Sequence, residues 1–154
     1  MPEPPIAPCL WLDDQAEAAA ALYARPHAGR VAATSRYPES ADNPAGRPRG
    51  SVLTVEVELA GRRFTLLNGG PAFTLDPSVS FFAHVDAPAD ADRLWAPLAE
   101  GGEALMPLDA YPWSERFGWV KDRFGVSWQA VPDGIAAWMA SPDAAALERA
   151  FARK

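Results

Sequence analysis

Two side chains in predicted strands are candidates for acid–base chemistry. His84 lies in the alternating segment 78–86, and an imidazole titrates near neutral pH, which suits a general base. Glu56 lies in the alternating segment 51–61, where a carboxylate covered by the rest of the chain would have a raised pKa. Each has a structural alternative. His84 can be a hydrogen-bonded histidine lining the sheet, and Glu56 can be solvated or paired with an arginine, so the catalytic role of both stays open.

Three other groups favour structural roles. A nucleophilic cysteine needs a neighbouring base, and none can be assigned to Cys9, which we expect to pack in the core beside Trp11. The glycine pair in segment 68–70 precedes neither a lysine nor a helix start, so it predicts a turn and not a phosphate loop. His27 is expected to be a solvated loop residue.

The overall charge excludes several classes of partner. The 154-residue chain has a formal net charge of −6 and no basic cluster, which argues against nucleic acid and anionic membrane as partners. Its single cysteine excludes an internal disulfide and fits a reducing compartment. No apolar run is long enough to span a bilayer, and the first ten residues do not resemble a signal peptide. A cytoplasmic location is expected.

Hydrophobic periodicity predicts the same element order twice, strand–helix–strand–strand–strand. Antiparallel hairpins with one crossover helix in each half predict an α+β fold. In the first half we expect strands at 8–12, 29–38, 51–61 and 63–68, a helix at 15–25 capped by Asp13 or Asp14, and a loop at 39–50. In the second half we expect strands at 78–86 and 103–108, a helix at 89–102, a loop at 109–117, a hairpin at 118–132, and a last helix from Ser141 that buries Leu147 and Phe151.

Several segments resemble the PhnB-like family of the vicinal oxygen chelate (glyoxalase/bleomycin resistance/dioxygenase) superfamily. They are "PCLWLDDQAEAAAALY", "RYPES", "TVEVELAGRRFTLLNGGP" and "GGEALMPLDAYPWSERFGWVKDRFGVSWQAVP". The resemblance covers about residues 5–132. It implies a domain over 1–132 with two βαβββ modules, about 5–70 and 76–132, which form a curved, partly open mixed sheet with a concave cavity. A helical tail (133–154) and a homodimer are also expected.

The resemblance also raises the question of a cofactor. Some family members are labelled 3-demethylubiquinone methyltransferases, but this chain lacks a Gly-rich strand-to-helix loop for S-adenosylmethionine. Enzymes of the superfamily commonly bind a divalent metal through four strand positions. At those positions this chain offers Ala7, Pro8 or Cys9, then Asn68, Ser78 or Ser80, and Gln129, and no histidine, aspartate or glutamate. Because a site built from serine, asparagine and glutamine holds transition metals poorly, we expect neither a metal nor another cofactor.

The hairpin at 118–132 predicts both core and cavity residues. Trp128, Phe124 and Val126 should serve the core, while Asp122 and Gly125 form the turn. The leading hypothesis is a metal-independent protein that binds a small organic molecule. Whether it is an enzyme stays open, since a lyase or isomerase with Glu56 or His84 as base, or a drug-sequestering resistance protein, would fit the same residues. The predicted ligand-binding residues are Trp11, Glu56, Asn68, Phe82, His84, Trp113, Trp119 and Gln129.

Overall fold

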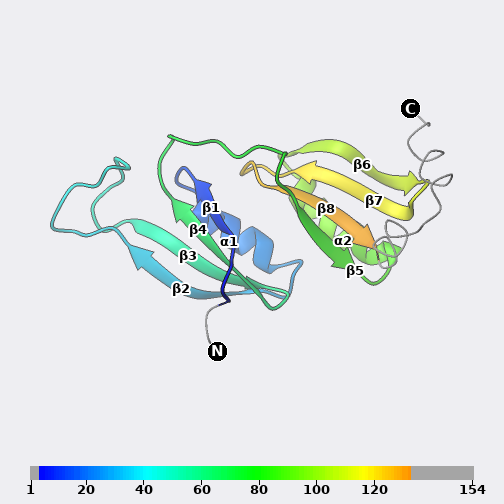
Figure 1. Ribbon diagram of the computed structural model, residues 1–154, viewed down its shortest axis with the longest axis horizontal. Coiled ribbons are helices and arrows are strands. Elements are labelled where there is room, and N and C mark those ends of the chain that lie inside the picture. The colour runs from blue at the N-terminus through cyan, green and yellow to red at the C-terminus, as the bar shows by residue number, and fades with distance from the viewer. Residues whose placement is uncertain (1–3, 133–154) are drawn as a thin grey trace. The chain divides into compact units, whose positions relative to one another are not determined.

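The computed structural model describes residues 4–132, which divide into two compact units between Leu75 and Asp76. Each unit contains one four-stranded sheet and one helix (Figure 1). Within residues 4–132 no helix combines the length and the apolar content that crossing a bilayer requires. The predicted tail helix lies outside the described residues.

Unit one follows the predicted order of elements. Its parts are β1 (Cys9–Leu12), α1 (Ala16–Ala24), β2 (Arg30–Arg36), β3 (Val52–Leu59) and β4 (Arg62–Asn68). The strands lie in the order β1-β4-β3-β2. β1 pairs with β4 in parallel, and the other neighbours are antiparallel.

Unit two repeats this arrangement. Its parts are β5 (Phe81–Val85), α2 (Pro88–Ala99), β6 (Glu103–Tyr111), β7 (Ser114–Lys121) and β8 (Ser127–Pro132). The strand order is β5-β8-β7-β6, with β5 parallel to β8. The predicted α+β class with βαβββ modules is therefore confirmed, as two open, mixed sheets.

Each helix buries one face of its own sheet. In α1 the expected stripe of Ala19, Leu22 and Tyr23 is buried, as are Val57 and Leu66 on the strands beneath it. Alternation in the strands therefore has a direct cause, because successive side chains point to opposite faces and only one face meets the helix.

Helix α2 covers the sheet of unit two in the same way. Leu94 and Leu98 are buried, and Trp95 is half-buried. The Trp95 ring packs on β7 at Gly118, where a Cβ atom would lie only 2.5 Å from Cζ3. This position therefore needs glycine for close approach of helix and strand.

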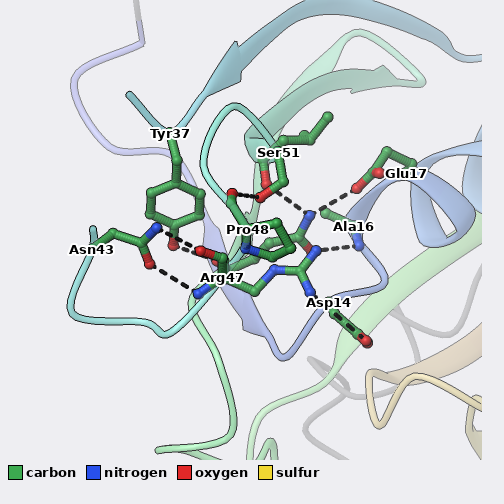
Figure 2. Close-up of polar contacts among 10 residues, drawn as sticks. Asp14, Ala16, Glu17, Tyr37, Asn43, Arg47, Pro48 and Ser51 are labelled. Atoms are coloured by element: carbon green, nitrogen blue, oxygen red, sulfur yellow. Dashed lines mark hydrogen bonds and ion pairs between the residues drawn. The ribbon is translucent and has the colours of Figure 1, made fainter. Parts of the chain in front are cut away.

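The predicted cap of α1 is wrong. The N-cap residue is Gln15, and its side chain makes no capping hydrogen bond. The Ala16 N–H instead donates to Oδ1 of Asn68, 2.8 Å away at the end of β4. Asp14 lies 3.9 Å from Nη1 of Arg47 (Figure 2). A cap supplied by a strand distant in sequence leaves no local signal.

Asn68, at the end of β4, links this strand to α1, to β3 and to Tyr37, which follows β2. It is fully buried, and its Nδ2 donates to Oε1 of Glu17 at 2.7 Å and to the Val52 carbonyl at 3.1 Å. Its own carbonyl accepts a 2.6 Å hydrogen bond from the Tyr37 hydroxyl. Every polar group of the side chain is therefore satisfied within unit one.

The loop predicted at 109–117 is also wrong. β6 continues to Tyr111 and β7 begins at Ser114, so only Pro112 and Trp113 separate the two strands. Their pairing contains three register shifts, between Ala104 and Tyr111. These irregularities break the period-two pattern from which a strand is recognised in sequence.

Two structural expectations are corrected as well. Cys9 is exposed on edge strand β1 and not packed in the core, and partial burial still raises the pKa of its thiol. His27 is half-buried and not solvated, and desolvation lowers the pKa of its imidazole.

Replacing Asn68 with alanine should lower the free energy of unfolding by about 2 to 4 kcal/mol, because buried hydrogen-bond partners lose their contacts. Urea denaturation measures this. Asn43→Ala is the matched control, since the Asn43 side chain hydrogen-bonds the backbone of Arg47 within its own loop. An equal loss in both variants would contradict the structural role of Asn68.

The melting temperature should fall as the pH is lowered through about 6.5. The pKa of His27 is lowered in the folded state, so the unfolded chain takes up the proton first and unfolding is favoured below the ordinary histidine pKa. Thermal melts between about pH 7.5 and 5.5 test this. His27→Gln should reduce the slope, and His84→Gln, which changes an exposed histidine, should leave it unchanged.

Candidate functional site

Unit one presents a mainly polar face on the side of the sheet away from α1. One row across β1, β4, β3 and β2 is Trp11, Leu67, Thr54 and Ser35, and the next is Cys9, Thr65, Glu56 and Ala33. The hydroxyls of Ser35 and Thr54 are hydrogen-bonded at 2.5 Å. The predicted residues Trp11 and Glu56 therefore share this face.

Glu56 lies beside an arginine. Oε2 of Glu56 is 3.8 Å from Nη1 of Arg63, and Nη2 of the same guanidinium is 3.7 Å from Oε1 of Glu58. The Glu56 side chain is about one third exposed. The arginine-paired alternative for Glu56 is thus present in the structure. Solvent-accessible pairs of this kind contribute little to stability.

Trp11 holds the turn after β4. Its Nε1 donates to the Gly70 carbonyl at 2.9 Å, and its ring lies edge-on to Phe73 with centroids 4.9 Å apart. A Cβ atom at Gly69 would lie 2.4 Å from the Trp11 ring. The glycine pair therefore allows close packing in a turn, as predicted, and no helix begins there.

Asn68 does not share the face of Trp11 and Glu56. It pairs with Leu12 at the end of β1, and its amide faces the start of α1. The bonds that cap the helix already occupy its side chain.

Unit two presents an aromatic face on the side of the sheet away from α2, here called the helix-free face. Phe82, Gln129, Trp119 and Met106 form one row across β5, β8, β7 and β6. Three of these four were predicted as ligand-binding residues. Met106 was missed, since the irregular pairing of β6 concealed which of its side chains share a face.

A cluster of rings surrounds Phe117 and Val131 on the helix-free face. Met106, Tyr111, Trp113 and Trp119 pack against these two buried residues and are themselves only half-buried. Tyr111 and Trp113 stack with centroids 5.0 Å apart, and Phe117 meets both edge-on at 5.7 Å. Desolvation, and then the charge of Asp109, raise the pKa of Tyr111, so its phenol stays neutral at physiological pH. The cluster is an apolar, stacking surface.

Polar groups accompany these rings. Nε2 of Gln129 donates to the Ser80 hydroxyl at 2.8 Å, which orients the amide. His84 is exposed, and its ring lies 6.0 Å from that of Phe82, which is 53% exposed. The face therefore combines exposed aromatic edges with a fixed amide.

The hairpin between β7 and β8 is built around a buried carboxylate. Oδ1 of Asp122 accepts from the N–H groups of Phe124 and Val126 at 2.8 and 3.1 Å, and Oδ2 accepts from Nε1 of Trp128 at 3.0 Å. Gly125 has φ of 90°, as predicted for the turn. Trp128 is buried on the α2 side, also as predicted. Asp122 thus fixes the strand that carries Gln129.

The described side chains do not form an obvious metal site. Among residues 4–132, no three histidine, cysteine, aspartate or glutamate side chains converge closely enough to hold an ion. Of the four positions considered for a metal, Asn68 faces a helix and Gln129 is bonded to Ser80. The side chains at these two positions are therefore already engaged within the protein.

The fold defines the class of protein: an α+β protein made of two βαβββ units, each with an open, mixed sheet. The model of the family described as 3-demethylubiquinone-9 3-methyltransferase matches residues 4–131. The chain belongs to this family. The match supports the predicted PhnB-like, glyoxalase-superfamily assignment.

Solved structures agree. A PhnB protein from Bacillus cereus is 30% identical, with 84% of this chain and 99% of that chain covered and a TM-score of 0.74. A Pseudomonas aeruginosa protein is 26% identical, with coverages of 84% and 98% and a TM-score of 0.68. The fosfomycin resistance protein FosX from Listeria monocytogenes shares the fold at 11% identity, with coverages of 88% and 98% and a TM-score of 0.58. No curated protein matches this chain in sequence.

Asp122→Asn should lower the free energy of unfolding by about 1 to 3 kcal/mol, because an NH₂ group would replace one of the two oxygens that accept buried N–H groups. Urea denaturation followed by near-UV circular dichroism reports both stability and the packing of Trp128. Asp109→Asn changes an exposed carboxylate on β6 and should stay within about 0.5 kcal/mol of the parent protein. Equal effects would refute the role of Asp122.

Proposed function

We propose that the protein binds a small organic molecule on the helix-free face of unit two, without a metal. The observation that supports this proposal is the ring cluster around Phe117 and Val131, half-buried on the side of the sheet that α2 does not cover. Ligand sites in proteins are typically lined by apolar and aromatic side chains with a few oriented polar groups. Gln129, held by Ser80, is such a group.

The proposed site draws on five of the predicted residues, namely Phe82, His84, Trp113, Trp119 and Gln129. Asn68 is left out because its amide is occupied in capping α1. Trp11 and Glu56 of unit one remain predicted ligand residues, and the homodimer and the cytoplasmic location remain predictions too.

Methyl transfer is not part of this proposal. S-Adenosylmethionine sites of the parallel-sheet type use a glycine-rich loop that leads from a strand into a helix. Here the glycines that follow β4 are packed under Trp11 and lead into a turn. The residues therefore do not fit that cofactor, and no step through it is derived.

Base catalysis has less support than binding. His84 is exposed and has the apolar ring of Phe82 as its neighbour, which cannot orient an imidazole through a hydrogen bond. Oε2 of Glu56 lies 3.8 Å from Nη1 of Arg63, so the carboxylate already has a charged partner on the protein.

Naphthalene, a planar hydrocarbon, provides a direct test in buffer that contains EDTA. In protein with ¹⁵N-labelled tryptophan, binding should shift the indole N–H signals of Trp113 and Trp119. Trp113→Ala should weaken binding by about tenfold, because it removes one of the stacked rings.

Phe73→Ala is the control, since it removes an exposed ring of unit one. It should leave the affinity unchanged. Loss of binding in EDTA, or equal weakening by both substitutions, would contradict a metal-free site on this face.

A further inference from the structure

Among residues 4–132, two polar atoms on the helix-free face have no hydrogen-bond partner. They are Nε1 of Trp119 and Oγ of Ser127, and both are shielded from solvent. Ser127 is only 2% exposed. Buried polar groups are paired in the great majority of cases, so each exception needs an explanation.

Two other indoles of the described residues show the usual arrangement. Nε1 of Trp11 donates to the Gly70 carbonyl, and Nε1 of Trp128 donates to the Asp122 carboxylate. Trp119 differs from both, although it lies in the middle of a regular antiparallel pair. Its N–H therefore lacks an acceptor at the place where the proposed ligand would lie.

The two unpaired atoms belong to neighbouring side chains. Trp119 pairs with Gln129 across β7 and β8, and Ser127 pairs with Lys121, so Trp119 and Ser127 are diagonal neighbours on one face. Diagonal positions are about 7–8 Å apart, which long aromatic side chains can bridge. A carbonyl oxygen on a ligand, which has two lone pairs, can accept from two donors placed in this way, whereas a ring nitrogen accepts from one of them.

The chemistry of the donors restricts the ligand. An indole N–H can only donate, so the partner must be a hydrogen-bond acceptor. Lys121 lies on the same face. The hydrogen bonds from Ser78 lower the pKa of Asp76 most, and the charge of Lys121 adds to this effect, so Lys121 already interacts with a carboxylate. A neutral acceptor fits this setting better than an anion.

We infer that the ligand is a planar aromatic molecule with a neutral hydrogen-bond acceptor that receives the Trp119 N–H; a ring nitrogen accepts this one bond, and a carbonyl oxygen, which has two lone pairs, also receives the Ser127 hydroxyl. This inference rests on the proposed function, since it specifies the ligand of the same face. The flat ring lies against the exposed edges of Phe82 and Trp119, and the acceptor points to β8.

The test compares quinoline and isoquinoline with naphthalene, because they replace one CH group by an acceptor nitrogen without changing the shape. Each is titrated into the full-length, ¹⁵N-tryptophan-labelled protein near pH 8, where both bases are neutral. The ratio of dissociation constants, hydrocarbon over heterocycle, is compared between parent and variants, which cancels differences in hydrophobicity.

The ratio for the better-bound heterocycle should fall by about tenfold in Trp119→Phe, which retains a ring but removes the donor. It should fall less in Ser127→Ala, a small change at a buried position, because the single lone pair of the ring nitrogen is taken by the indole N–H. Trp95→Phe, on the α2 side of the sheet, should leave the ratio unchanged. The heterocycle should also move the Trp119 indole signal downfield.

The outcomes separate this inference from the proposed function. An unchanged ratio in both donor variants, while all three probes bind, would overturn the acceptor inference and leave the binding face intact. Absence of binding by all three probes would overturn both. A fall in the ratio for the Trp95 variant as large as for Trp119 would attribute the effect to general loosening and would also overturn the inference.

Discussion

Within residues 4–132 each unit has a single helix to cover a sheet that has two faces, and the other features of the structure follow from this constraint. The covered face collects aliphatic residues such as Val57 and Leu94, which provide the hydrophobic driving force for folding. The residues that face away from the helix are less constrained by packing, so they can differ between the two units. In unit one they are mainly hydroxyl and charged groups, and in unit two they are mainly aromatic. The βαβββ pattern thus separates residues that maintain the fold from residues available for binding.

Buried polar groups set the geometry that packing alone would leave open. Asn68 fixes where α1 begins relative to β4, and Asp122 fixes the turn that aligns β7 with β8. Both groups are satisfied by several bonds, so the cost of removing them from water is offset. The unpaired indole of Trp119 contrasts with them, since the same reasoning applied to it indicates that a partner is missing.

The fold was largely predictable because it depends on local periodicity. Alternation in the strand now called β3 and the helical stripe that ends at Tyr23 both reflect contact with one covering layer. The errors occurred where distant residues decide the local structure. The cap of α1 comes from Asn68, and the strand β6 is bent by irregular pairing with β7. Neither interaction leaves a pattern within a short window of sequence.

The candidate site was predictable only in part. Strand parity correctly grouped Phe82 with His84, and the register between strands adds Gln129 and Trp119 to that face. Asn68 was assigned to the ligand by its position at the end of a strand, whereas its side chain faces the helix. Tyr111 and Phe117 were placed in a loop, so their stacking with Trp113 could not be foreseen.

The parallel pairing of the outer strands has a consequence for synthesis of the chain. In each unit the first strand pairs with the last, as in Cys9 with Thr65 and Phe81 with Trp128. Such non-local pairing delays folding until the closing strand is available. Because both partners of each pair lie within one unit, the sheet of unit one needs no strand of unit two and can form once β4 has left the ribosome. The order of the two units along the chain is then also an order of assembly.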